Sequence, residues 1–141
     1  MAIIWRDSMT VGNVHIDQDH RYLICLINTI ELALQTPEEK EIITGALMQL
    51  EQYTEEHFDK EEEIQKKFSY PNQYDHLKKH RELVTQFKNI KGQIEKSLET
   101  TKKIEDPQVI IKFLRHWLID HVIQEDLQMK PFLKNYPGDM Y

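Results

Sequence analysis

The stretch ITGALMQLEQYTEEHFDKEEEIQKKF, residues 43–68, decides the fold because its apolar side chains recur every three or four residues. This spacing puts them on one face of an α-helix, the face that a globular protein buries against neighbouring helices. The predicted inward face carries a histidine and a glutamate among apolar residues, in the order Ile43, Leu47, Leu50, Tyr53, His57, Glu61, Ile64 and Phe68. The stretch therefore predicts a long helix with two ionisable groups on its buried side.

Three more segments have the same periodicity, and the whole pattern predicts helices over about residues 18–35, 37–68, 73–101 and 107–126. The predicted inward residues of the other three are Ile24, Ile27, Ile30 and Leu34; His76, His80, Leu83, Phe87, Ile90 and Ile94; and Ile110, Leu114, Trp117, Leu118 and His121. Four helices joined by short loops favour an all-α, up-down-up-down four-helix bundle.

The segment ends carry their own signals. Thr36-Pro37-Glu38-Glu39 has the pattern of a capped helix start, and Asp106-Pro107 puts a proline at the start of the last helix. We expect an irregular N-terminal arm over residues 1–17, anchored by Trp5, and a tail over residues 127–141 with a short helix before Pro137-Gly138. A length of 141 residues fits one domain, 1–141.

Composition limits the classes of function. The net charge is -6 and both signs are interspersed, which argues against nucleic acid as a main partner because phosphate binding needs a basic face. The sequence contains no apolar run of membrane-spanning length and no signal-peptide pattern at its start. Cys25 is the single cysteine, so no internal disulfide is required. These features predict a cytoplasmic protein without a membrane partner.

Two ionisable pairs lie on the predicted buried faces. His57 and Glu61 are four residues apart, as are His76 and His80, so each pair shares one helical face. A His-x-x-x-His pair arises readily by chance among seven histidines, and a lone histidine on an apolar face is usually a core residue. Burying so many ionisable groups without partners would, however, cost several kcal/mol each. A shared metal cation removes that cost and is the favoured interpretation.

The arrangement resembles the hemerythrin family, specifically its bacterial single-domain members. The matching stretches are VHIDQDH at 14–20, HFDKEE at 57–62, HLKKH at 76–80 and WLIDHVIQED at 117–126. The resemblance implies a non-haem di-iron centre in which His76, His80 and His121 bind one iron and His20 and His57 bind the other. It also implies that Glu61, Asp126 and a solvent-derived oxo or hydroxo group bridge the two ions.

Counting those ligands leaves one open position, on the second iron, and an open position is typical of sites that bind or activate a ligand. The resemblance therefore implies reversible dioxygen binding by a carrier, storage or delivery protein without catalytic turnover; no protein recipient of the oxygen is evident. The resembling oxygen-pocket positions are all apolar, as expected for a site that excludes water, although an ordinary core would look the same: Leu23, Phe58, Trp117, Leu118 and Val122.

Two alternatives stay open. One is a di-iron oxidase or peroxidase that consumes dioxygen, peroxide or nitric oxide, and the other is iron buffering. Ferritin-like oxidases use carboxylate-rich sites with Glu-x-x-His motifs. This sequence contains no Glu-x-x-His, and histidines outnumber carboxylates five to two in the predicted ligand set. The donor set therefore favours binding over oxidation of a substrate.

Spacing makes one more structural prediction. His121 and Asp126 are five residues apart, about 140° around a regular α-helix, so they reach one site only if the helix widens to a π-type turn or breaks. His116 lies about 140° around a regular helix from His121, so we expect it to point to solvent or to a seam between helices. We assign no ligand role to His15 or His116 and interpret Cys25 as a packing residue.

Two neighbours of the predicted ligands depart from the family pattern. Asp19 precedes His20 where glutamine is common, and Asp120 precedes His121 where asparagine is frequent. A carboxylate that reached a ligand imidazole would orient it and make it more basic, and the iron would then autoxidise faster. The acidic run 61–63 is expected to be a solvated face from which Glu61 alone turns inward.

Overall fold

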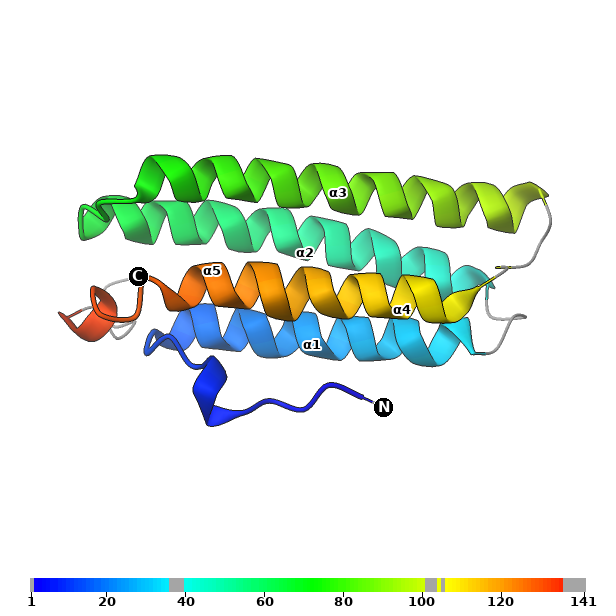
Figure 1. Cartoon of the computed structure of the whole chain (residues 1–141), viewed down its shortest axis with the longest axis horizontal. Helices are drawn as coiled ribbons and strands as arrows, with labels where there is room; N and C mark the ends of the chain where they lie inside the picture. The colour runs from blue at the N-terminus through cyan, green and yellow to red at the C-terminus, as the bar shows by residue number, and fades with distance from the viewer. Residues whose placement is uncertain (1, 36–39, 101–103, 105, 136–141) are drawn as a thin grey trace.

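The computed structural model describes residues 2–35, 40–100, 104 and 106–135, and four helical rods dominate it (Figure 1). The first three are α1 (Val14–Leu34), α2 (Lys40–Lys67) and α3 (Gln73–Thr100). The fourth rod is continuous but changes type along its length: α4 (Pro107–Arg115), a π-helix η2 (His116–Ile123) and α5 (Gln124–Leu127). Short 3-10 turns, η1 (Asp7–Met9) and η3 (Leu133–Asn135), flank the bundle.

Consecutive rods run in opposite directions, as the colour gradient of Figure 1 shows. The rod α1 packs against α2 and against the α4–η2 rod, and α3 packs against α2 and η2, so the four rods close into one ring of neighbours. No strand occurs in the described part of the chain. The predicted all-α, up-down-up-down bundle is confirmed. None of the described helices is long and apolar enough to cross a bilayer.

Capping residues set where the rods begin. The rod α1 starts at Val14 rather than near residue 18, because Asn13 Oδ1 accepts the amides of His15 and Ile16 at 3.0 and 3.1 Å. At the start of α4, the Asp106 carboxylate accepts the Gln108 amide at 3.2 Å and Pro107 occupies the first turn, as predicted. The predicted cap at 36–39 and the stop at Pro137-Gly138 lie outside the described residues.

The N-terminal arm is shorter than predicted and packs along the outside of the bundle. Trp5 is half-buried against the main core, and the Arg21 guanidinium lies 4.7 Å above its ring. Ile3 exchanges two hydrogen bonds with the Asn28 side chain, at 2.8 and 2.9 Å. Cys25, expected to pack, is exposed, because the buried face of α1 is formed by the residues on either side of it.

Two apolar clusters fill the interior. The larger one follows the length of the four rods, and the smaller one closes the end where α2 turns into α3; its members are Val11, Ile16, Ile64, Tyr70, Met129 and Leu133. The turn between α2 and α3 brings Tyr70 into the smaller cluster. Ser69 adopts a left-handed conformation with φ of 53°, and the Tyr70 amide donates to the Gln65 carbonyl at 3.0 Å, a Schellman-type helix end.

Candidate metal centre

Six of the seven predicted ligands converge between the two apolar clusters, at one end of the bundle. They come from every rod: His20 from α1, His57 and Glu61 from α2, His76 and His80 from α3, and Asp126 from α5. None is more than 4% exposed. Among the described residues they form two overlapping groups of potential metal ligands, and both groups include Glu61 and Asp126. Helical spacing explains this arrangement, because residues four apart on α2 and on α3 point to the same side.

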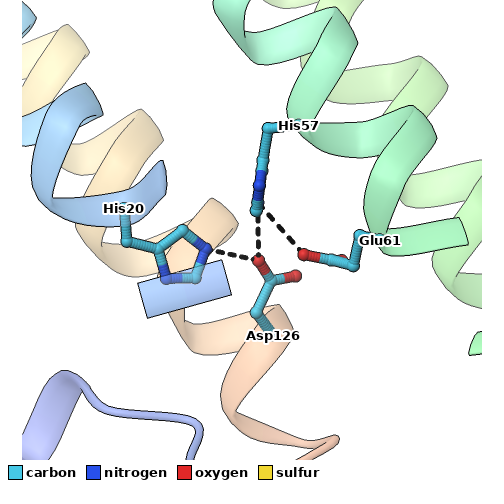
Figure 2. A group of neighbouring side chains, drawn as sticks. All are labelled: His20, His57, Glu61 and Asp126. Atoms are coloured by element: carbon cyan, nitrogen blue, oxygen red, sulfur yellow. Dashed lines mark hydrogen bonds and ion pairs between the residues drawn. The ribbon is translucent and has the colours of Figure 1, made fainter. Parts of the chain in front are cut away.

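The first group joins α1, α2 and α5, and Figure 2 shows its imidazoles and carboxylates pointing toward one another. His20 Nε2 lies 2.6 Å from Asp126 Oδ2. His57 Nε2 lies 3.3 Å from the same oxygen and 3.1 Å from Glu61 Oε2. The two rings meet edge to face with centroids 4.8 Å apart. Two imidazole nitrogens and two carboxylates thus surround one point.

The second group joins α3 to the same two carboxylates. His76 Nε2 lies 2.7 Å from Glu61 Oε1 and 2.9 Å from Asp126 Oδ1. His80 Nε2 lies 3.1 Å from Glu61 Oε1. Each carboxylate therefore faces imidazoles of both groups, the placement required of a residue that bridges two cations.

The outer nitrogens of two of these imidazoles contact further carboxylates. His57 Nδ1 lies 2.9 Å from Asp19 Oδ2, and His80 Nδ1 lies 3.0 Å from Glu62 Oε2. Carboxylate–histidine–metal series are built this way, with the outer N–H held so that the inner nitrogen faces the metal. Glu62, predicted to be a solvated residue, is half-buried in this contact. Nothing in its sequence context distinguishes it from Glu63, which is exposed.

Electrostatics show how the metal-free protein holds these charges. Burial and the charge of Asp126 raise the pKa of Glu61, but hydrogen bonds from His57, His76 and His80 outweigh both, so its pKa is lowered. Burial also raises the pKa of Asp126, yet hydrogen bonds from His20, His57 and His76 hold it well below the usual range. Both groups are therefore carboxylates at neutral pH.

The pKa values of the imidazoles shift in the opposite direction. Burial lowers the pKa of His76, but hydrogen bonds to Asp126 and Glu61 outweigh it and raise the pKa to about 10. The pKa of His57 is likewise raised well above its usual value, against burial, by Asp126, Asp19 and Glu61, and that of His80 is raised by Glu61 and Glu62. In the metal-free protein, protons on the Nε2 atoms thus bind these imidazoles to the carboxylates. A metal cation would replace those protons.

The donor set fits a transition metal. Imidazole nitrogens with carboxylate oxygens suit iron, and also manganese, zinc or cobalt. Two buried carboxylates that repel each other need positive charge between them. In the described part of the chain, His20 Nδ1 has no hydrogen-bond partner although its side chain is fully buried. The fully buried Glu61 Oε2 has only the His57 ion-pair contact, at 3.1 Å. A cation between the groups would contact the glutamate oxygen and neutralise both carboxylates.

His121 lies outside both groups. The π-helix predicted from its spacing to Asp126 is present, but it runs from His116 to Ile123 and so begins before His121. In a π-helix residues five apart share a face, which puts the His121 ring against that of His116 with centroids 4.7 Å apart. His116 is exposed to solvent, as expected, but the expected separation of about 140° from His121 was wrong. Asp120 contacts His116 Nδ1 rather than a predicted ligand.

The predicted oxygen-pocket residues all lie in the larger apolar cluster: Leu23, Phe58, Trp117, Leu118 and Val122. The Phe58 ring stacks on the His80 imidazole with centroids 3.8 Å apart and planes 4° from parallel. Trp117 donates its indole N–H to the Leu83 carbonyl at 2.9 Å, which satisfies its polar atom and fixes the ring. Of the five, Phe58 thus contacts ligand imidazoles directly, and its ring also lies 5.8 Å from that of His57.

Taken together, the rods and the side chains define a four-helix-bundle protein with a buried histidine–carboxylate metal centre. The sequence model of the hemerythrin HHE cation binding domain matches residues 11–133. The chain belongs to the hemerythrin family, whose domain implies non-haem iron as the cation.

Individual relatives are distant in sequence. A bacteriohemerythrin of Stenotrophomonas maltophilia is 23% identical over 124 residues, which cover 88% of this chain and 76% of that protein. A hemerythrin-like protein of Naegleria gruberi is 26% identical over 129 residues, 92% of each chain. A crystal structure of a leucine-to-phenylalanine mutant shares the fold with a TM-score of 0.76 at 22% identity, covering 94% of this chain and 98% of the other.

Proposed function

We propose that this chain binds dioxygen reversibly at a non-haem di-iron centre, as a carrier, storage or delivery protein without catalytic turnover. The observation that carries the proposal is the pair of overlapping ligand groups that share Glu61 and Asp126 inside an apolar surround. One iron would lie between these carboxylates and His20 with His57, and the other between them and His76 with His80. When bound, the two ferrous ions supply the electrons that dioxygen takes up.

The protein's own part is to hold the donors and to exclude water. His57 and His80 are oriented through their Nδ1 contacts to Asp19 and Glu62. The apolar side chains around the site keep protons and water from the bound ligand, which favours release of dioxygen over irreversible oxidation. In this proposal His121 binds the same iron as His76 and His80. The position at His20 and His57 has fewer protein ligands and would be the one that receives dioxygen.

One observation favours the alternative of an oxidase or peroxidase. Asp19 puts a buried carboxylate on the outer nitrogen of His57, at the position proposed to receive dioxygen. An anionic partner makes an imidazole a stronger donor, which promotes oxidation of the iron. The balance between this charge and the apolar surround decides whether dioxygen is returned or consumed.

An oxygen electrode separates the two functions. We expect the ferrous-loaded protein to take up about one dioxygen for two irons, by the di-iron chemistry above, and to return it when the solution is purged with argon. Continued uptake in the presence of a reductant would show turnover and favour the oxidase. A Glu61→Ala variant, which lacks one shared carboxylate, is the matched control and should take up little dioxygen reversibly.

A further inference from the structure

Asp19 occupies an unusual place beside the metal centre. Its side chain is 7% exposed, and its two oxygens have different partners. Oδ2 accepts from His57 Nδ1 at 2.9 Å, and Oδ1 accepts the Tyr53 hydroxyl at 2.7 Å. Lys60 Nζ, the cation that the structure places beside Asp19, lies 4.0 Å away on a side chain that is 42% exposed. The carboxylate is therefore fixed in the interior by two hydrogen bonds and is only weakly neutralised from outside.

The corresponding contact on the other half of the site differs. Glu62 accepts from His80 Nδ1 at nearly the same distance, 3.0 Å, but its side chain is 23% exposed. Water screens a charge at such a position far more than one in the interior. The two halves of the centre thus have the same kind of outer contact. The Asp19 charge beside His57 is poorly screened by water, whereas the Glu62 charge beside His80 is well screened.

We propose that Asp19, held by Tyr53, is a positioning residue that makes the metal position at His20 and His57 the more easily oxidised of the two. The inference rests on the proposed di-iron function. Asp19 fixes the His57 tautomer, so that Nε2 presents its lone pair to the cation, and its charge increases the donor strength of the ring. A stronger donor and a nearby buried anion both stabilise the ferric ion more than the ferrous ion. With iron bound, the ion held by His20 and His57 would therefore have the lower oxidation potential of the two.

Anaerobic spectroelectrochemical titration of the iron-loaded protein tests this, because it measures potentials without dioxygen. Asp19→Asn keeps an oxygen that can accept the His57 N–H and removes the charge. We expect it to shift the equilibrium between ferrous and ferric forms about tenfold toward ferrous, which raises the first oxidation potential by about 59 mV. Glu62→Gln, the matched loss of charge on the other half, should shift the potential much less.

Tyr53→Phe provides a second, independent variant. Without the phenol, Asp19 keeps its charge but loses a donor that partly neutralises it, so the potential should move down. Equal shifts for Asp19→Asn and Glu62→Gln, or an upward shift for Tyr53→Phe, would overturn the proposal. A wild-type protein that shows the expected potentials yet never returns dioxygen would refute the carrier function and leave the role of Asp19 standing.

Discussion

The imidazole of His121 packs edge-on against that of His116, with ring centroids 4.7 Å apart and planes 82° from parallel. The pair exists because η2 is π-helical, and residues five apart in a π-helix face the same way. His121 is half-buried at this place, five residues before Asp126 along the same rod. In the proposed di-iron centre His121 is an iron ligand, so we expect its imidazole to leave His116 when iron binds.

The role of His121 can be tested with iron affinity. We expect His121→Ala to weaken iron binding about tenfold or more, since one of three histidines at that ion is lost. His116→Ala removes the partner ring without removing a proposed ligand and should leave the affinity nearly unchanged. Isothermal titration of the metal-free variants with ferrous iron under anaerobic conditions measures both. Equal affinities for wild type and His121→Ala would show that the six converging residues suffice.

Much of the fold and site follows from sequence spacing, and the exceptions have physical reasons. Periodic apolar positions fix the helices and their buried faces, so His57, Glu61, His76 and His80 could be placed in the core in advance. The five-residue gap between His121 and Asp126 indicated a π-type turn. Where that turn begins depends on packing between rods, and this is why the contact with His116 was missed.

Contacts between rods also explain why the polar partners of Asp19 could not be predicted from the sequence. The sequence indicated that Asp19 could contact a ligand imidazole, but its partner, His57, lies on another helix, 38 residues away. Tyr53 was predicted only as a core residue, and its hydroxyl contact with Asp19 depends on the packing of α1 against α2. Such polar pairs leave no periodic signal, because each uses a single position of each helix.

Glu61 should prove essential to both metal positions. In Glu61→Gln the shared carboxylate is lost and the imidazolium groups of His57, His76 and His80 lose a buried counter-charge. We expect the metal-free variant to be destabilised by about 3 kcal/mol, and iron content to fall well below two per chain. Denaturant unfolding and metal analysis measure these effects. Glu63→Gln, on the exposed face of the same helix turn, is the control; a Glu61→Gln protein that still bound two irons would contradict the shared role.

The metal-free protein should lose stability in alkali. The pKa of His76 is about 10 in the folded protein against 6.5 in the unfolded chain, so its contribution is complete below pH 6.5 and disappears as the pH rises through 10. The lowered pKa of Asp126 acts in the other direction: its contribution is present above pH 3.8 and is lost as the pH falls through the folded-state value.

Thermal unfolding of the metal-free protein should therefore give its highest Tm between these limits. Toward pH 10 the Tm should fall by several degrees, since about 1 kcal/mol of stability moves Tm by roughly 3–5 °C for a chain of this size. In the iron-loaded protein cations replace the protons, and the alkaline fall should be much smaller. A metal-free protein whose Tm is flat from pH 6.5 to 10 would show that the imidazolium–carboxylate contacts do not stabilise it.

The buried charge of Asp19 also leads to a prediction about the rate of autoxidation. Replacement of Asp19 by glutamine removes the buried charge and retains a side chain that can accept a hydrogen bond. We expect autoxidation of the oxygenated Asp19→Gln protein to be about tenfold slower, in line with the usual effect of such outer contacts. Loss of the oxygenated spectrum over time measures the rate, and a rate equal to that of the wild type would count against the effect.

Reversible binding itself is tested most directly by visible absorption of the ferrous-loaded protein, recorded under argon, after air is admitted, and after argon is restored. The account predicts a colourless protein that gains a charge-transfer band in air and loses it when oxygen is removed, through several cycles. A band that converts within one cycle to a permanent ferric spectrum would contradict the carrier function and identify the centre as one that consumes dioxygen.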